Sequence, residues 1–159
     1  MTRPPWDQYF LGLAETVATR ATCDRKHVGA VLVRDFQYLS SGYNGSPRGL
    51  PHCDDVGHEL KEMAGRASCV RTVHAEANAI AHAAKHGICV AEATCYSTAI
   101  PCYECCKLLI NAGISRIVYR EYYESRCGMS GDPVRELLAA AGIELEHCPC
   151  DTNQSTSDR

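Results

Sequence analysis

Two short blocks of the sequence contain side chains that bind soft divalent metals. The first is "HAE", with His74 and Glu76, and the second is "PCYEC", with Cys102 and Cys105. Imidazole nitrogen and thiolate sulfur are the ligands that structural and catalytic Zn²⁺ sites use most. In the first turn of a helix, residues three apart project to one side, so a Cys-x-x-Cys there can bind one ion. We therefore expect His74, Cys102 and Cys105 to bind zinc.

Three protein ligands would leave the fourth position of a tetrahedral zinc ion for water, which is typical of a catalytic site. Zinc can bring the pKa of its water to about 7, so that hydroxide becomes available near neutral pH. Glu76 lies two residues after the histidine, from where it can reach both this water and a substrate. The spacing thus favours a catalytic metal over one that only stabilises the fold.

Each block alone is a weak signal. An isolated Cys-x-x-Cys is often a structural zinc half-site or a redox pair, and an isolated His-x-Glu arises by chance in many chains. The two blocks together match the zinc deaminase signature, in which H-x-E is followed by P-C-x-x-C. Here a proline precedes the first cysteine, a helix is expected after each block, and a strand is expected between them.

The elements around the two blocks would bring the ligands together. "VHAEANAIAHAAKHG" is rich in alanine and ends at Gly87, and "CYECCKLLINAG" ends at Gly113, which predicts two helices that begin at the two blocks. At a helix N-terminus, the macrodipole and the free N–H groups lower the pKa of a cysteine and favour the thiolate that zinc requires.

The rest of the pattern predicts an α/β fold. An amphipathic helix is expected from Trp6 to Arg20, and "DPVRELLAAAG" predicts a helix with Asp132 as its N-cap. The expected strands are "VGAVLV" and "YLSSGYN", which would form a hairpin, then "ATCYSTA", "SRIVYRE" and "IELEH". Strands separated by helices require crossovers and parallel neighbours, so we expect a mixed five-stranded sheet with helices on both faces.

Residues 45–68 are rich in Gly, Pro and charged residues, with little periodicity beyond a short helix expected near "HELKEMAG". A loop of this length in a small domain is usually functional and held by something other than packing. One domain is expected at residues 1–147. The polar segment at residues 148–159 is expected to be disordered.

Composition and charge restrict the class of protein. A chain of 159 residues that is 45% hydrophobic can form one core, and a net charge of -3 favours a small ligand over a nucleic acid polymer. No segment has the pattern of a signal peptide or a membrane span, so we expect a cytoplasmic protein without a membrane partner. In a reducing cytosol, the eleven cysteines are expected to be metal ligands, buried thiols or redox groups rather than disulfides.

The chain resembles the cytidine deaminase superfamily and, within it, the deoxycytidylate (dCMP) deaminases. The resemblance extends from about residue 3 to residue 147 and includes "RPPWDQYF", "VGAVLV", "GYNGSPRGLPHC", "CVRTVHAEANAI" and "LLINAGISRIVY". It implies a three-layer α/β/α fold and the zinc-dependent hydrolysis of dCMP to dUMP and ammonia. In that reaction an activated water attacks C4 of the base, while Glu76 protonates N3 and later carries a proton to the leaving amine.

The resemblance also implies substrate contacts. Asn44 matches an asparagine that contacts the sugar, and the backbone N–H of Ala75 would meet the base carbonyl. The 5'-phosphate needs charged donors, for which the candidates are Arg25, Lys26 and Arg48. Tyr122 and Tyr123 are weaker candidates for contact with the base. The alternatives are a turn after a strand for Asn44 and ordinary solvated surface for the three cations.

A second, structural zinc ion is implied by the same resemblance. Cys23, Cys53 and Cys69 match positions that some dCMP deaminases use for it, and His58 or His52 would supply the fourth ligand. Such an ion would hold the long loop of residues 45–68. The alternative is that the three cysteines are simply buried thiols.

The resemblance further implies a homo-oligomer, often a hexamer in this family, with dCTP and dTTP as allosteric effectors. Ala77, Cys106 and "YYESRCGMSG" depart from the family pattern near the expected base and phosphate ends, which concerns the substrate more than the reaction. The alternatives are a deaminase of another cytosine or adenine nucleoside or nucleotide, including tRNA adenosine, and a non-catalytic zinc-binding module. The sequence assigns no role to Cys127, Cys148 or Cys150.

Overall fold

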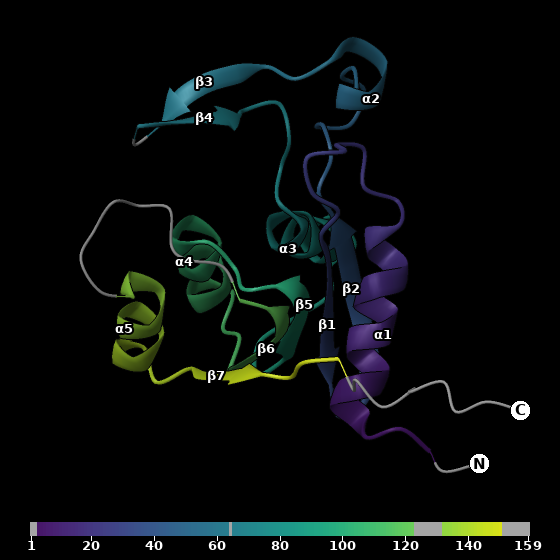
Figure 1. Cartoon of the computed structure of the whole chain (residues 1–159). Coiled ribbons are helices and arrows are strands. Elements are labelled where there is room, and N and C mark those ends of the chain that lie inside the picture. Colours follow the sequence, from purple (N-terminus) through teal and green to yellow (C-terminus); the bar gives the residue numbers. More distant parts are fainter. Residues whose placement is uncertain (1–2, 64, 123–131, 151–159) are drawn as a thin grey trace, which may run out of the picture.

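Helices cover both faces of a central sheet, and a separate small hairpin projects beyond one end of it (Figure 1). The computed structural model describes residues 3–63, 65–122 and 132–150. The helices are α1 (Trp6–Ala18), α2 (Cys53–Val56), α3 (Ala75–Lys85), α4 (Tyr103–Asn111) and α5 (Pro133–Ala140). The strands are β1 (Gly29–Arg34), β2 (Gln37–Tyr43), β3 (Leu60–Met63), β4 (Arg66–Cys69), β5 (Thr94–Ala99), β6 (Arg116–Glu121) and β7 (Glu144–His147).

The central sheet is mixed and five-stranded, as the sequence predicts, with the order β2-β1-β5-β6-β7. Strand β1 is antiparallel to both β2 and β5, whereas β5, β6 and β7 are parallel to one another. The parallel half follows from the helices α4 and α5, because each carries the chain back across the sheet between two strands. The predicted fold class is therefore confirmed.

Alternating side chains in the strands separate two hydrophobic clusters. On one face, Phe10, Leu11 and Ala14 of α1 pack against Val31 and its neighbours in the sheet. On the other face, residues of α3, α4 and α5 pack against the opposite side chains of the same strands, including Leu32, Cys95 and Ile117. Because successive strand residues point to opposite faces, the three central strands β1, β5 and β6 contribute to both clusters.

The prediction of a short helix near "HELKEMAG" is wrong. Strands β3 and β4 form a two-stranded antiparallel hairpin there, and the short helix of this region is α2, which begins at Cys53. Gly65 lies in the connecting turn with a φ of 75°, a conformation that glycine adopts at little cost. The pairing of Leu60 with Cys69 carries Cys69 back toward α2.

Helix α3 lies unusually close to β2 because Gly42 has no side chain. A Cβ atom at Gly42 would lie 2.3 Å from the carbonyl oxygen of Ala75 and 2.4 Å from the amide nitrogen of Ala79. Gly29 has the same role between β1 and α1, where a Cβ would lie 2.1 Å from the carbonyl oxygen of Ala14. These two glycines therefore fix how closely the helices approach the sheet.

The last described residues lie against α1. Arg120 donates to the carbonyl oxygens of Cys148 and Pro149, at 3.1 and 3.2 Å, and its side chain also binds Glu15. The segment predicted to be disordered thus begins with residues that are hydrogen-bonded, and its remainder, residues 151–159, lies outside the described residues. None of the described helices has the length and hydropathy needed to cross a membrane.

Candidate metal centre and catalytic site

The two blocks singled out in the sequence meet where α3 and α4 begin. His74 is the N-cap of α3, and Cys102 is the N-cap of α4 with its sulfur accepting the backbone N–H of Cys105. The Nδ1 atom of His74 lies 3.3 Å from the sulfur of Cys102 and 3.4 Å from that of Cys105. The three donor atoms are thus all within 4.8 Å of one another, which suits ligands of one ion.

The electrostatics of the three side chains also suit a cation. A hydrogen bond from the thiol of Cys105, together with His74, lowers the pKa of Cys102 to about 4. The contact with Cys102 raises the pKa of His74 to about 9. The hydrogen bond to Cys102 and burial raise the pKa of Cys105, since a second thiolate beside the first is unfavourable. A divalent cation relieves this repulsion, so the donor set fits zinc.

Glu76 is buried in the first turn of α3, with 3% of its surface exposed. The buried residues of this helix are Ala75, Glu76, Ala79 and Ala83, so the carboxylate occupies the face that packs on the sheet. Burial raises its pKa above the usual range of a glutamate. Its Oε1 atom accepts a hydrogen bond of 3.2 Å from the hydroxyl of Ser97 on β5.

Ser97 and Asp24 are polar contacts that the sequence analysis missed. A serine in an expected strand, or an aspartate in an expected loop, carries no sequence signal of such a contact. Ser97 contacts Glu76 because the fold places β5 beside the start of α3, and Asp24 contacts His58 because the fold brings their two loops together.

A second group of side chains that could hold a metal ion lies outside the central sheet. Its members are Cys23, Cys53, His58 and Cys69, whose donor atoms lie within 4.8 Å of one another. Cys23 approaches Nδ1 of His58 at 3.7 Å, and the sulfurs of Cys53 and Cys69 are also 3.7 Å apart. Four donors suit a closed tetrahedral site. His52, the alternative fourth ligand, is not part of the group.

The environment of the second group supports metal binding. Burial raises the pKa of Cys53 to about 12. Burial acts in the same direction on Cys69, but the backbone N–H groups of Arg71 and Glu59 outweigh it and lower the pKa of Cys69 to about 7. The Nε2 atom of His58 lies 3.0 Å from a carboxylate oxygen of Asp24, which leaves Nδ1 directed at the thiols.

Asn44 is buried, and both ends of its amide brace the loop before β1. Its Oδ1 atom accepts from the backbone N–H of Val28, and its Nδ2 atom donates to the carbonyl of Lys26, each at 2.7 Å. Asn44 therefore has a structural role in the turn after β2, as the alternative interpretation predicts. Its Nδ2 atom has a second hydrogen that can be donated to a ligand. The backbone N–H of Ala75 lies in the first turn of α3, where such groups have no partner within the helix.

The three cations proposed for phosphate are in different situations. Lys26 forms an ion pair of 2.8 Å with Glu121, and Arg25 donates to the carbonyl of Ala67 at 3.1 Å, whereas Arg48 is exposed. The hydroxyl of Tyr122 donates to Asp132 at 3.0 Å, which ties it to the start of α5. Tyr123 and Cys127 lie outside the described residues.

Four buried polar atoms have no hydrogen-bond partner among the described residues. They are Oγ1 of Thr22, Oγ of Ser46, Nδ1 of His52 and Nε of Arg71. Thr22 and Ser46 belong to the two segments that meet at Asn44, since the backbone N–H of Thr22 donates to the carbonyl of Asn44. Buried polar groups are normally paired, so this region offers donors and acceptors to a bound molecule.

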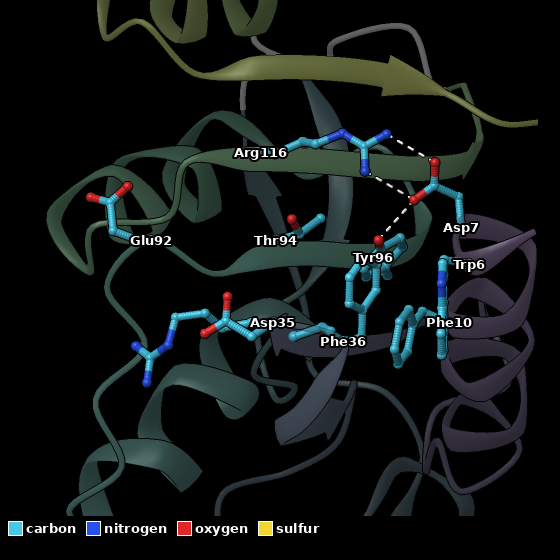
Figure 2. A pocket seen from close by; sticks show the side chains of 11 residues that line it. Trp6, Asp7, Phe10, Asp35, Phe36, Glu92, Thr94, Tyr96 and Arg116 are labelled. Carbon is cyan, nitrogen blue, oxygen red and sulfur yellow. Dashed lines mark hydrogen bonds and ion pairs between the residues drawn. The ribbon is translucent and has the colours of Figure 1, made fainter.

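A cavity of about 440 Å³ is lined by Trp6, Asp7 and Tyr96 among others (Figure 2). It includes Thr94 at the start of β5, whereas Cys102 follows the end of that strand, so the cavity and the first group of candidate ligands lie at opposite ends of the sheet. Two of its charged groups pair with each other: Arg116 binds Asp7 through two hydrogen bonds of 2.9 Å, and Tyr96 donates to Asp7 at 2.7 Å. Figure 2 shows these contacts joining α1 to β5 and β6. The cavity therefore lies where α1 packs on the sheet, and the candidate catalytic site is not part of it.

Comparisons with known proteins agree with the geometry of the first group. Residues 4–121 match a family model described as the cytidine and deoxycytidylate deaminase zinc-binding region, which includes both ligand blocks. The matched range and the clustered ligands together show that the protein binds Zn²⁺.

Two curated relatives span most of the chain. The chain is 39% identical to the ComE operon protein 2 of Bacillus subtilis, over 95% of this chain and 75% of the relative. It is 41% identical to the deoxycytidylate deaminase of Mycobacterium phage D29, over 75% of this chain and 97% of the relative. Among solved structures, dCMP deaminase from the cyanophage S-TIM5 in complex with dCMP and dUMP matches with a TM-score of 0.73 and 25% identity, over 93% of this chain and all of that chain.

Proposed function

The chain belongs to the cytidine and deoxycytidylate deaminase family, and from this premise we propose that it hydrolyses dCMP to dUMP and ammonia. The observation that carries the proposal is the convergence of His74, Cys102 and Cys105 beside the buried carboxylate of Glu76. The substrate rests on the phage D29 relative named for this activity and on the cyanophage structure bound to dCMP and dUMP. The protein is accordingly a zinc-dependent hydrolase.

In this proposal His74, Cys102 and Cys105 hold the catalytic zinc. When bound, zinc acts as a Lewis acid that makes water a nucleophile near neutral pH. Glu76 is the general acid and base: it takes a proton from the attacking water and gives it to N3 of the cytosine. It then takes the proton of the hydroxyl group now on C4 and gives it to the amine, which leaves as ammonia when the C4–N bond breaks. Its burial supports this role, because a raised pKa lets a carboxyl group hold a proton near neutral pH.

For the substrate, we assign the base carbonyl to the backbone N–H of Ala75 and the sugar to the second Nδ2 hydrogen of Asn44. Arg25, Lys26 and Arg48 are the proposed cations for the 5'-phosphate, and Tyr122 is a minor contact with the base. The buried hydroxyls of Thr22 and Ser46 support a polar ligand near Asn44, because they have no partner among the described residues.

We further propose that Cys23, Cys53, His58 and Cys69 bind a second, structural zinc ion. The support is the number of donors, which completes a tetrahedron, and the carboxylate of Asp24 behind His58. The three segments that carry these ligands lead directly to Lys26, Asn44 and His74. A zinc ion here would therefore hold the loops around the catalytic site.

The remaining parts of the proposal rest on the family. The protein is proposed to act as a cytoplasmic homo-oligomer, with a hexamer as the expected form, and to respond to dCTP and dTTP. Residues 1–147 are proposed as the deaminase domain, with residues 148–159 as an appended polar segment. Size-exclusion chromatography with light scattering, with and without each effector, measures the first two properties.

A substrate panel tests the proposed function. Purified zinc-loaded protein is incubated with dCMP, deoxycytidine, dCTP or a tRNA anticodon stem, and the release of ammonia is measured. We expect turnover with dCMP and none of comparable rate with deoxycytidine, because the phosphate supplies charged contacts that the nucleoside lacks. If only the nucleoside or only the tRNA is deaminated, that compound is the substrate and the assignment of dCMP is wrong. If none of the four compounds is deaminated, the result favours a non-catalytic zinc-binding module.

A further inference from the structure

We propose that Ser97 is a positioning residue for Glu76, holding its carboxylate in the orientation used for proton transfer. Its hydroxyl donates to Oε1 of Glu76 at 3.2 Å, and its side chain has no exposed surface. This inference rests on the proposed role of Glu76 in deamination. The side-chain hydrogen bond of Ser97 goes to Glu76 rather than to a proposed metal ligand, and no sequence motif identifies Ser97.

The register of the sheet explains why Ser97 faces Glu76. Cys95, Ser97 and Ala99 alternate along β5 and point to the face covered by α3 and α4, whereas Tyr96 points to α1. Ser97 pairs with Ala30 of β1 on one side and with Tyr119 of β6 on the other, so the strand is held from both sides at this position. The rigid centre of a sheet therefore carries the hydroxyl, which favours precise placement of its partner.

A hydroxyl at this position is costly unless it is bonded. The neighbouring Cys95 and Cys106 are buried, with pKa values raised by burial, so the surroundings are apolar. An unpaired buried hydroxyl is unfavourable, and hydrogen bonds to charged groups are stronger than those between neutral groups. The bond to Glu76 is thus the interaction that stabilises Ser97 in place.

The bond distinguishes the two oxygens of Glu76. Oε1 accepts from Ser97 on the sheet side, while the carboxylate also contacts its own backbone N–H and the thiol of Cys105, so the three contacts together set its orientation. Without Ser97, the carboxyl group keeps its burial and its contacts with its own backbone N–H and with Cys105, but it loses the contact from the sheet, so its last torsion, which has broad minima, is less restricted. A group that is present but misoriented lowers the chemical step more than it lowers substrate binding.

Ser40 on β2 provides a matched control in the same sheet, separated from β5 by β1. It is also buried, and its hydroxyl also reaches α3, but it donates to the backbone carbonyl of Ala79 at 2.8 Å. Loss of either hydroxyl removes one buried hydrogen bond to the same helix. Only loss of Ser97 removes a bond to the carboxylate, so the two variants separate positioning from stability.

The test compares Ser97→Ala and Ser40→Ala with the unchanged protein, using dCMP as substrate. We expect Ser97→Ala to lower kcat about tenfold with KM within about twofold and zinc content unchanged, as for loss of one hydrogen bond to a charged group. Ser40→Ala is expected to keep kcat within about twofold. A kcat for Ser97→Ala equal to that for Ser40→Ala would overturn the proposal.

A second measurement is independent of the substrate. In a double-mutant cycle of Ser97→Ala and Glu76→Ala, we expect Ser97→Ala to lower the urea midpoint when Glu76 is present and to lower it less in the Glu76→Ala background. Equal shifts in both backgrounds would show that the hydrogen bond contributes nothing and overturn the proposal. If the cycle shows coupling but dCMP is not turned over, the proposed function fails while the contact stands.

Discussion

Glu76 combines two properties that rarely occur together, a fully buried carboxyl group and a place beside three metal-binding side chains. A buried carboxyl group lowers the stability of the folded protein unless it is hydrogen-bonded, so burial of Glu76 carries a cost in folding free energy. Groups of this kind are concentrated in active sites, because a raised pKa suits proton transfer near neutral pH. Substitution of Glu76 is therefore the most direct test of the mechanism.

Replacing Glu76 by glutamine keeps the shape of the side chain but removes the exchangeable carboxyl proton. We expect Glu76→Gln to lower kcat for dCMP by about 100-fold to 10,000-fold, the range typical of a lost general acid or base. Zinc content, measured by atomic emission, should not change, because Glu76 is not among the grouped ligands. Glu104→Gln, on the exposed side of α4, is the control, and turnover by Glu76→Gln equal to that control would contradict the mechanism.

Asp7 gives a prediction about pH. The hydrogen bonds and charge of Arg116, together with the hydroxyl of Tyr96, hold the pKa of Asp7 below its ordinary value of 3.8. A carboxyl group with a lowered folded-state pKa contributes stability that is complete above its unfolded pKa and is lost as the pH falls through its folded pKa. The contribution of Asp7 should therefore be constant near neutrality and disappear in acid.

Asp7→Asn is expected to lower the free energy of unfolding by about 1–3 kcal/mol at pH 7, the range for hydrogen bonds to charged groups. The difference from the unchanged protein should begin to shrink below about pH 4 and continue to shrink in stronger acid, as followed by urea unfolding at several pH values. Asp35→Asn, an exposed aspartate in the turn between β1 and β2, is the control. A difference that is independent of pH would exclude the ion pair as its cause.

At the scale of elements, the position of α3 decides whether the ligands meet. The helix carries His74 at its N-cap and Glu76 in its first turn, and it packs on β2 through the gap that Gly42 leaves. A methyl group at Gly42 would overlap the backbone of α3, which cannot move aside without moving both functional residues. The distance between helix and sheet is thus part of the site.

Gly42→Ala is therefore expected to lower the free energy of unfolding by about 1–3 kcal/mol, as for overpacking of a core, and to weaken zinc binding at the first group. Gly12→Ala is the matched control, because a Cβ at Gly12 of α1 meets nothing within 4 Å. That change should stabilise the protein by about 0.5–1 kcal/mol through helix propensity. Urea unfolding and zinc titration measure both, and an unaltered zinc affinity in Gly42→Ala would contradict the coupling.

At the scale of the whole molecule, the proposed second zinc site would restrain the segment that contains the small hairpin. Strands β3 and β4 form an isolated two-stranded hairpin, and such a hairpin is marginally stable in water. Cys53 and His58 precede the hairpin, Cys69 ends it, and Cys23 belongs to the loop after α1. A metal ion bound by all four would connect the hairpin region to the rest of the protein.

We expect purified protein to contain two zinc ions per chain and Cys53→Ser to contain one, because removing a thiolate from a closed site destroys it. Trypsin should then cleave within residues 45–70 of the variant faster than in the unchanged protein, since the ligands no longer restrain this segment. Cys89→Ser, which changes an exposed thiol outside both groups, should behave as the unchanged protein. One zinc ion per unchanged chain would remove the second site.

The sequence by itself determined the elements of the central sheet and identified His74, Cys102 and Cys105, which the structure brings together as candidate metal ligands. These follow from local rules: hydrophobic periodicity indicates helices and strands, and His74, Cys102 and Cys105 lie at the starts of helices that their own neighbours specify. Asp132 was identified as an N-cap for the same reason, and its side chain does accept the backbone N–H of Arg135.

The tertiary structure alone decided the contacts between distant segments. At "HELKEMAG" the local pattern indicates a helix, but the structure has strand β3, which pairs with β4. His58 rather than His52 joins the three cysteines, and Ser97 faces Glu76, because the fold brings together residues that are far apart in the chain. Local propensity is weak compared with the free energy of pairing and packing, so such contacts cannot be read from neighbours in the sequence.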